Sequence, residues 1–132
     1  MVQDSAAYYG RMREAWEFAA AHPELSLGGC SGDGIAVHSE GGAAVVRAEG
    51  EELTILCWAA EEGAEWALMD LVVGMASARG CTRVRGEFVA TGKNDSMREY
   101  LAQFGFTMIG EDERGTLWIL PVSAYEPMGL GG

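Results

Sequence analysis

Residues 82–106 read TRVRGEFVATGKNDSMREYLAQFGF, and this stretch decides the fold. Apolar and polar residues alternate from Thr82 to Phe88, which predicts a strand with one buried face. Asn94 is a residue type that begins helices, and Gly105 is one that ends them. The residues expected to face inward from this helix are Met97, Leu101 and Phe104. The stretch therefore predicts a strand, a loop and a helix that runs from 94 to 104.

The remainder of the chain predicts an α+β fold built around this unit. The expected helices are 5–22, 63–79 and 94–104, and the expected strands are 35–38, 43–48, 53–58, 82–88, 106–109 and 116–120. Glycine-rich turns join the first three strands into an antiparallel meander. We expect helix 63–79 on one sheet face and helix 94–104 on the other. One domain at 1–121 and a flexible tail at 122–132 complete the prediction.

Composition excludes several classes of protein. The chain has 132 residues, of which 48% are hydrophobic and 22% charged, enough for one buried core. Its net charge is −11, from 9 basic and 20 acidic residues, which argues against nucleic-acid and anionic-membrane partners. No apolar run approaches the ~20 residues that span a bilayer, and no signal peptide opens the chain. We therefore expect a cytoplasmic protein.

Cysteine and histidine usage predicts neither a disulfide framework nor a metal site. The three cysteines, Cys30, Cys57 and Cys81, form an odd set without C-x-x-C spacing. We expect them to be reduced and mostly buried. The two histidines do not stand at metal-ligand spacing.

Two stretches carry a resemblance to a known family. The run GEFVATGKN at 86–94, followed by Tyr100 and by FGF at 104–106, resembles the C-terminal acyltransferase-like domain of FkbH-like proteins of bacterial polyketide biosynthesis. The pattern there is close to G-E-Y-x-P-T-x-K-N. The stretch CWAAEEGAE at 57–65 is similar to that family's C-R-V-L-G-R-G-V-E. The resemblance covers roughly residues 50–120, and residues 1–48 do not match, which implies an abbreviated N-terminus.

The resemblance implies the GNAT fold, a mixed, mostly antiparallel sheet with helices on both faces. Its central strands splay apart, and an acyl-pantetheine thioester lies in the gap. In that superfamily the backbone N–H groups of an R-x-x-G-x-G-type loop hold the cofactor pyrophosphate at a helix N-terminus. Here Gly63 is kept, but Glu61 and Glu62 bring negative charge to the loop. The helix tyrosine that protonates the departing thiolate is replaced by Leu101, with Tyr100 one residue away.

These considerations give two sets of candidate residues. The candidate catalytic residues are Glu87, as a base, and Tyr100, as an acid. Glu87 is alternatively one arm of an ion pair with Arg83 or Arg85. The candidate residues for binding a thioester are Gly63, Thr91, Lys93 and Asn94. We expect no metal and no tightly bound cofactor, and acyl-CoA or carrier-protein phosphopantetheine as the exchangeable thioester.

Three functions remain open. The first is an acyltransferase-like enzyme that handles a thioester on CoA or on an acyl carrier protein in polyketide-type secondary metabolism. The second is a GNAT-fold enzyme with other chemistry on a small or tethered substrate. Its apolar pocket would be lined by Trp58, Trp66, Met69 and Phe88. The third is a non-catalytic module that binds a partner or forms a homodimer.

Overall fold

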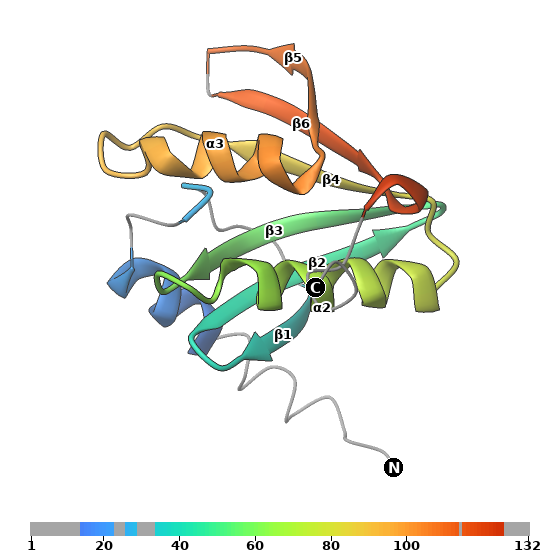
Figure 1. Ribbon diagram of the computed structural model, residues 1–132, viewed down its shortest axis with the longest axis horizontal. Coiled ribbons are helices and arrows are strands. Elements are labelled where there is room, and N and C mark those ends of the chain that lie inside the picture. The colour runs from blue at the N-terminus through green and yellow to red at the C-terminus, as the bar shows by residue number, and fades with distance from the viewer. Residues whose placement is uncertain (1–13, 23–25, 29–33, 114, 126–132) are drawn as a thin grey trace.

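The computed structural model describes residues 14–22, 26–28, 34–113 and 115–125, and these build one mixed sheet with helices packed on it. The sheet has six strands in the order β1-β2-β3-β4-β6-β5 (Figure 1). The strands are β1 (Ile35–Ser39), β2 (Gly42–Glu49), β3 (Glu52–Ala60), β4 (Arg83–Phe88), β5 (Thr107–Glu111) and β6 (Thr116–Pro121). Only β3 and β4 pair in parallel; the other named strand pairs are antiparallel. The predicted α+β class and the predicted meander are confirmed.

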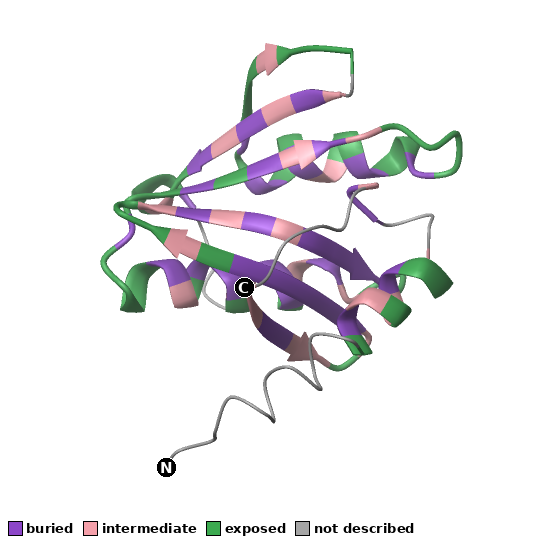
Figure 2. Cartoon of the chain, turned by 180° about the vertical axis from the view of Figure 1, so that it is seen from behind, coloured by how far each residue is buried: buried purple, intermediate pink, exposed green. Residues whose placement is uncertain are grey.

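Helices cover both faces of the sheet, but their distribution differs from the expectation. α2 (Glu65–Ala78) and α3 (Asp95–Phe104) lie on the same face, and the helical segment 14–21 lies on the other (Figures 1 and 2). The prediction that helices 63–79 and 94–104 take opposite faces is wrong. α2 connects β3 to β4, and α3 connects β4 to β5. In both cases the two strands run in the same direction, and the chain moves toward the β5 edge of the sheet. Right-handed crossovers of this kind place both helices on one face.

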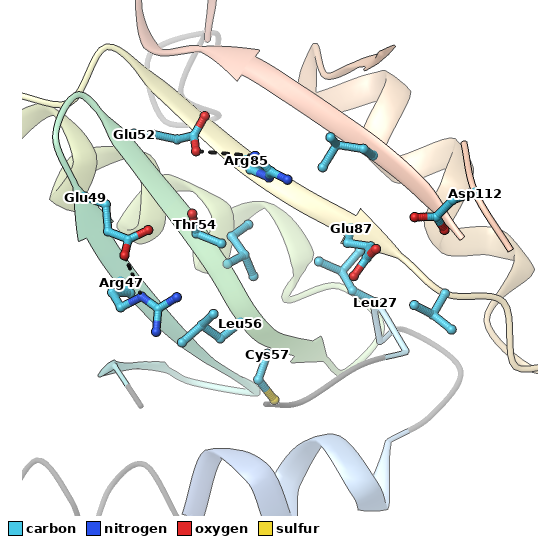
Figure 3. A pocket seen from close by; sticks show the side chains of 13 residues that line it. Leu27, Arg47, Glu49, Glu52, Thr54, Leu56, Cys57, Arg85, Glu87 and Asp112 are labelled. Atoms are coloured by element: carbon cyan, nitrogen blue, oxygen red, sulfur yellow. Dashed lines mark ion pairs between the residues drawn. The ribbon is translucent and has the colours of Figure 1, made fainter. Parts of the chain in front are cut away.

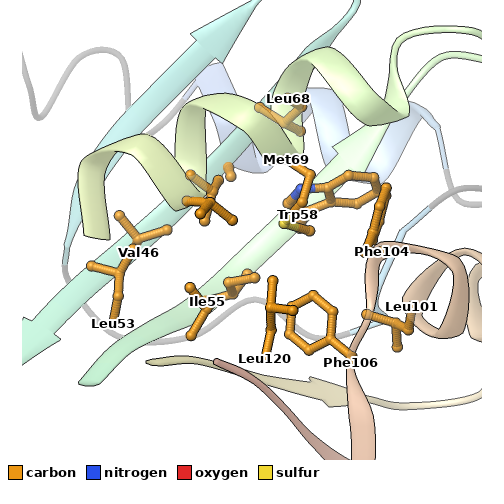
Figure 4. Packing of buried hydrophobic residues seen from close by; sticks show 14 of the residues in the cluster. Val46, Leu53, Ile55, Trp58, Leu68, Met69, Leu101, Phe104, Phe106 and Leu120 are labelled. Carbon is orange, nitrogen blue, oxygen red and sulfur yellow. The ribbon is translucent and has the colours of Figure 1, made fainter. Parts of the chain in front are cut away.

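The larger core lies between the sheet and the two helices (Figure 4). Trp58 is fully buried, and Phe104 packs edge-on against both Trp58 and Trp66. The expected inward residues of α3, Met97 and Leu101, are fully buried as well. Small residues dominate a second cluster under segment 14–21, so this helix lies close to the sheet. The members of that cluster are Ala15, Ala19, Ala36, Ala43, Val45, Cys57 and Ala59.

Packed structure continues past the expected end of the domain at residue 121. Val122–Ala124 forms a short 3-10 helix, η2, and Tyr125 is buried against the core. The ring of Tyr125 stacks on Trp66 at 6.3 Å between centroids, and its phenol donates a hydrogen bond to Asp70. Burial, and then this hydrogen bond, raise the pKa of Tyr125. The remainder of the expected tail, 126–132, lies outside the described residues.

One cysteine departs from the expected reduced state. Cys57 is disulfide-bonded, whereas Cys81 is free and buried. Disulfides persist mainly in oxidising compartments. The expectation of reduced cysteines is therefore wrong for Cys57, and the cytoplasmic location stays a prediction. Within the described ranges no helix is long and apolar enough to cross a membrane.

The end of the sheet at β5 is open to solvent. β5 is the last strand in the order, and Met108 and Ile109 are 46% and 58% exposed. The acidic residues Glu111, Asp112 and Glu113 follow them and are also exposed. This edge is the most apolar exposed surface of the described strands.

Replacing Leu101 tests the core between α3 and the sheet. Leu101→Ala removes a fully buried side chain and should lower the free energy of unfolding by about 2–5 kcal/mol. Leu71→Ala is the matched control, because Leu71 is 45% exposed and should cost less than about 1 kcal/mol. Urea denaturation measures both, and equal losses would contradict the packing described.

Replacing Tyr125 tests its hydrogen bond to Asp70. The raised pKa means that the folded state keeps the phenolic proton longer than the unfolded state, whose tyrosine titrates near 10. Stability from this group is therefore complete below about pH 10 and is lost as pH rises beyond it, by up to about 1.4 kcal/mol per pH unit. Urea unfolding at pH 8, 10 and 11 should show a shallower loss for Tyr125→Phe than for the wild type. Identical pH slopes would refute this assignment.

Candidate functional site

β3 and β4 run side by side for only a short distance. Their parallel pairing joins Glu52–Thr54 to Arg83–Arg85 and then stops. β3 continues along β2, and β4 continues along β6. The β2–β3 register shifts between Val45 and Val46, and such a bulge bends the strand that carries the extra residue. The two central strands therefore diverge toward their C-terminal ends, where open sheets present ligand sites (Figure 1).

A segment from far away in the sequence bridges the diverging strands. The N–H of Leu27 donates to the carbonyl of Trp58 on β3 at 3.1 Å. The N–H of Val89, just after β4, donates to the carbonyl of Leu27 at 2.8 Å. Ser26 forms an antiparallel bridge with Ala59. Residues 26–28 thus use backbone groups that both strands direct into the gap.

Asn94 fastens this segment to the loop after β4. Its Oδ1 accepts from the N–H of Thr91 at 2.9 Å, and its Nδ2 donates to the carbonyls of Ser26 at 2.9 Å and Val89 at 3.0 Å. Asn94 is fully buried and stands at the N-cap of α3, but its side chain makes no capping hydrogen bond. The expectation that the Asn94 side chain caps this helix is therefore wrong. The amide instead shapes the loop and holds residue 26.

Gly28 makes the close approach possible. It has φ +90°, and a Cβ at this position would lie 2.0 Å from the carbonyl oxygen of Val89. Only glycine adopts this conformation readily and leaves the space. The other two loop candidates, Thr91 and Lys93, are exposed, and the N–H of Lys93 donates to Oγ1 of Thr91 at 3.2 Å.

A buried carboxylate occupies the N-terminus of α2. The N–H of Gly63, which has φ +96°, donates to Oε1 of Glu65 at 3.0 Å. Glu65 is 2% exposed, and its Oε2 is buried without a hydrogen-bond partner. Tyr100 on α3 lies near this carboxylate: the interaction with Glu65 raises the pKa of Tyr100, with partial burial and the charge of Glu62 adding to the effect. Glu61 and Glu62 are exposed beside it.

A polar pocket of about 730 Å³ lies on the sheet face opposite α2 and α3 (Figure 3). Glu52 pairs there with Arg85 at 3.7 Å and also with Arg83 at 2.9 Å, and Arg47 pairs with Glu49 at 3.5 Å. Glu87 points into the same pocket. Arg83 and Arg85, the arginines that the sequence placed beside it, both form ion pairs with Glu52. The charged residues lining the pocket are Arg47, Glu49, Glu52, Arg85, Glu87 and Asp112.

The predicted site residues therefore fall into three groups. Thr91, Lys93 and Asn94 share the loop at the gap. Gly63 and Tyr100 meet at Glu65, on the helical face. Glu87 lies in the pocket on the opposite face, so the structure does not place the two catalytic candidates together.

Two features of this region were not predicted from the sequence, and the residues expected to line an apolar pocket lie elsewhere. Residues 26–28 were not identified, because a short loop segment carries no periodic signal. Glu65 was also missed. The one signal for this residue was that the stretch 57–65 and the FkbH-like pattern C-R-V-L-G-R-G-V-E both end in glutamate. Of the residues expected to line the apolar pocket of the second hypothesis, Trp58, Met69 and Phe88 are buried in the core and Trp66 packs against it.

Comparison with known proteins identifies the fold. No protein-family model matches the chain, and no curated protein matches it either. Among solved structures, nourseothricin acetyltransferase matches with a TM-score of 0.54 and 25% identity over 62% of this chain. FdhC, a nucleotide-linked sugar GNAT, matches with a TM-score of 0.51 and 21% identity over 63%. PaiA N-acetyltransferase from Thermoplasma acidophilum, in complex with coenzyme A, matches with a TM-score of 0.54 and 9% identity over 66%.

These matches span 58%, 50% and 58% of the respective solved chains. They confirm the expected fold class, a GNAT-like α+β domain with a mostly antiparallel sheet and helices on both faces. The closer resemblance to FkbH-like proteins stays a prediction.

Replacing Asn94 tests how the gap is held together. Asn94→Ala leaves one N–H and two carbonyls without their partner, so the free energy of unfolding should fall by about 1–3 kcal/mol. Ser96→Ala, an exposed change on the same helix, should stay within about 0.5 kcal/mol of the wild type. Denaturant titration measures both variants. A neutral Asn94→Ala would show that the amide does not fasten residue 26 to the loop.

Proposed function

We propose that this chain is an acyltransferase-like enzyme that binds an acyl-pantetheine thioester in the gap between β3 and β4. The observation that carries the proposal is the pairing of Leu27 with both Trp58 and Val89. The carbonyl of Trp58 and the N–H of Val89, one on each side of the gap, both bond to the backbone of one residue placed between them. The amides of a pantetheine arm offer the same groups, and an added strand is a common mode of recognition. The fold shared with solved acetyltransferases supports the same reaction class.

Binding in the gap requires residues 26–28 to move. When the carbonyl of Ser26 leaves, Nδ2 of Asn94 keeps one bond to Val89 and gains a free N–H for a pantetheine or thioester carbonyl. Lys93 is exposed on the same loop and adds a positive charge beside it. Thr91 completes the residues proposed to bind the pantetheine arm, and Gly63 is the residue proposed for the pyrophosphate of CoA. The proposed donor is an acyl-pantetheine thioester, carried either on CoA or on carrier-protein phosphopantetheine, in a bacterial polyketide-type pathway.

The acceptor would enter from the pocket on the opposite face. An amine or hydroxyl attacks the thioester carbonyl, so that a C–N or C–O bond forms and the C–S bond breaks. Glu87 takes the proton from the attacking group, and the departing thiolate takes a proton from Tyr100, directly or through water. A tyrosine phenol titrates at about pH 10 and is protonated at neutral pH, so Tyr100 has a proton to give.

A partner-binding module without catalysis is the second candidate. It is favoured by the same segment 26–28, because the chain itself fills the gap that a thioester needs. In that case an acyl carrier protein or a second copy of the chain would bind elsewhere on the surface. Binding without turnover distinguishes this candidate from the first.

Replacing Glu87 tests the proposed enzyme. Thiol release from acetyl-CoA and from S-acetyl-pantetheine is measured with spermidine as a cationic amine acceptor and with glycerol as a neutral hydroxyl acceptor. Glu87→Gln should lower turnover by about 10²–10⁴-fold at an unchanged melting temperature, because the general base is lost. Glu49→Gln makes the same charge change at an exposed position of the pocket and should retain turnover within about threefold.

Two outcomes would count against the enzyme. Turnover of Glu87→Gln close to the wild-type rate would remove Glu87 as the base. No thiol release from either donor, with folded protein and all acceptors present, would favour the partner-binding module.

A further inference from the structure

The N-terminus of α2 already holds an anion that belongs to the chain. The Gly63 N–H, in the loop directly before the N-cap residue Ala64, donates to Oε1 of Glu65 at 3.0 Å. The carboxylate thus occupies a backbone donor beside the helix start, the kind of place where phosphates bind. A carboxylate at this end of a helix is favoured by the helix dipole. Glu65 is also 2% exposed, so the carboxylate lies inside the protein rather than in solvent.

The second oxygen of this carboxylate makes the position unusual. Oε2 is buried and has no hydrogen-bond partner among the described residues. A buried charge with an unsatisfied oxygen is costly, and a side chain that served only to begin a helix would extend into water. Two aromatic residues lie in the same region: Tyr100 interacts with Glu65 from α3, and Trp66, the next residue along the chain, packs edge-on against Phe104.

From this geometry we infer that Glu65 selects against CoA, so that the site takes acyl thioesters of pantetheine that carry no nucleotide pyrophosphate. The inference rests on the proposed function. A nucleotide pyrophosphate would have to displace the Glu65 carboxylate from the Gly63 N–H and would meet its charge at short range. The exposed Glu61 and Glu62 add to that repulsion, whereas a pantetheine arm in the gap does not require the α2 N-terminus. Pantetheine thioesters, free or phosphorylated at the 4′ position, remain as substrates.

The experiment measures affinities of three thioesters by calorimetric titration at fixed ionic strength. The probes are acetyl-CoA, S-acetyl-pantetheine and S-acetyl-4′-phosphopantetheine. The wild type should bind S-acetyl-pantetheine at least tenfold more tightly than acetyl-CoA. Glu65→Ala should tighten acetyl-CoA at least tenfold and change S-acetyl-pantetheine less than threefold. Glu65→Gln keeps an acceptor for Gly63 and removes the charge, so its acetyl-CoA affinity should lie between the two.

Glu99→Ala is the matched control. It makes the same charge change at an exposed position of α3, beside Tyr100, and should alter each affinity less than threefold. If Glu99→Ala tightens acetyl-CoA as much as Glu65→Ala does, the general negative charge of the chain is responsible and the inference is overturned. It is also overturned if the wild type binds acetyl-CoA as tightly as S-acetyl-pantetheine, or if folded Glu65→Ala and Glu65→Gln leave acetyl-CoA unchanged.

A fourth probe, ADP, separates this inference from the proposed function. If no variant binds S-acetyl-pantetheine but ADP binds Glu65→Ala at least tenfold more tightly than the wild type, the proposed function fails and the role of Glu65 stands. Tight binding of both pantetheine probes would support a carrier-held phosphopantetheine arm. Tight binding of S-acetyl-pantetheine alone would support a free pantetheine thioester; both results uphold the exclusion of CoA.

Discussion

The short parallel pairing of β3 with β4 is the constraint on which the rest of this structure depends. After Thr54 and Arg85 the two strands have no shared hydrogen bonds, and each keeps its other neighbour. Backbone groups that diverge inside a sheet must find other partners, because unsatisfied buried donors and acceptors are costly. Residue 27 satisfies one group on each side, and Asn94 holds the neighbouring carbonyls. Another extended chain could therefore take over the backbone hydrogen bonds that residue 27 makes in the gap.

Two groups of candidate residues lie on opposite faces of the sheet. On the helical face, the buried Glu65 carboxylate interacts with the partly exposed Tyr100 at the N-terminus of α2. On the other face, Glu87 lies among paired arginines and further carboxylates in an open pocket. A reaction at the gap would draw on both faces, with the donor reached from one and the acceptor from the other.

The sequence predicted the elements well and the contacts between them poorly. Alternation from residue 82 to 88 and helical spacing from 94 to 104 are local properties, and both elements formed with Val84 and Leu101 buried as expected. α2 and α3 share a face because both crossover connections are right-handed. The prediction of opposite faces did not take this rule into account. The Asn94 side chain, a cap by residue type, bonds instead to a carbonyl 68 positions away. Glu65 looked like an ordinary first-turn residue, because burial by a later helix is not a local property.

The open edge at β5 has a consequence for the protein in solution. An outer strand with exposed Met108 and Ile109 presents unpaired backbone groups that can add a further strand. Glu111, Asp112 and Glu113 follow directly, and acidic residues beside an apolar strand act as gatekeepers against self-association. Added salt screens such charges, while the apolar pair is unaffected by screening. A rise in ionic strength should therefore favour association of this acidic chain through the β5 edge.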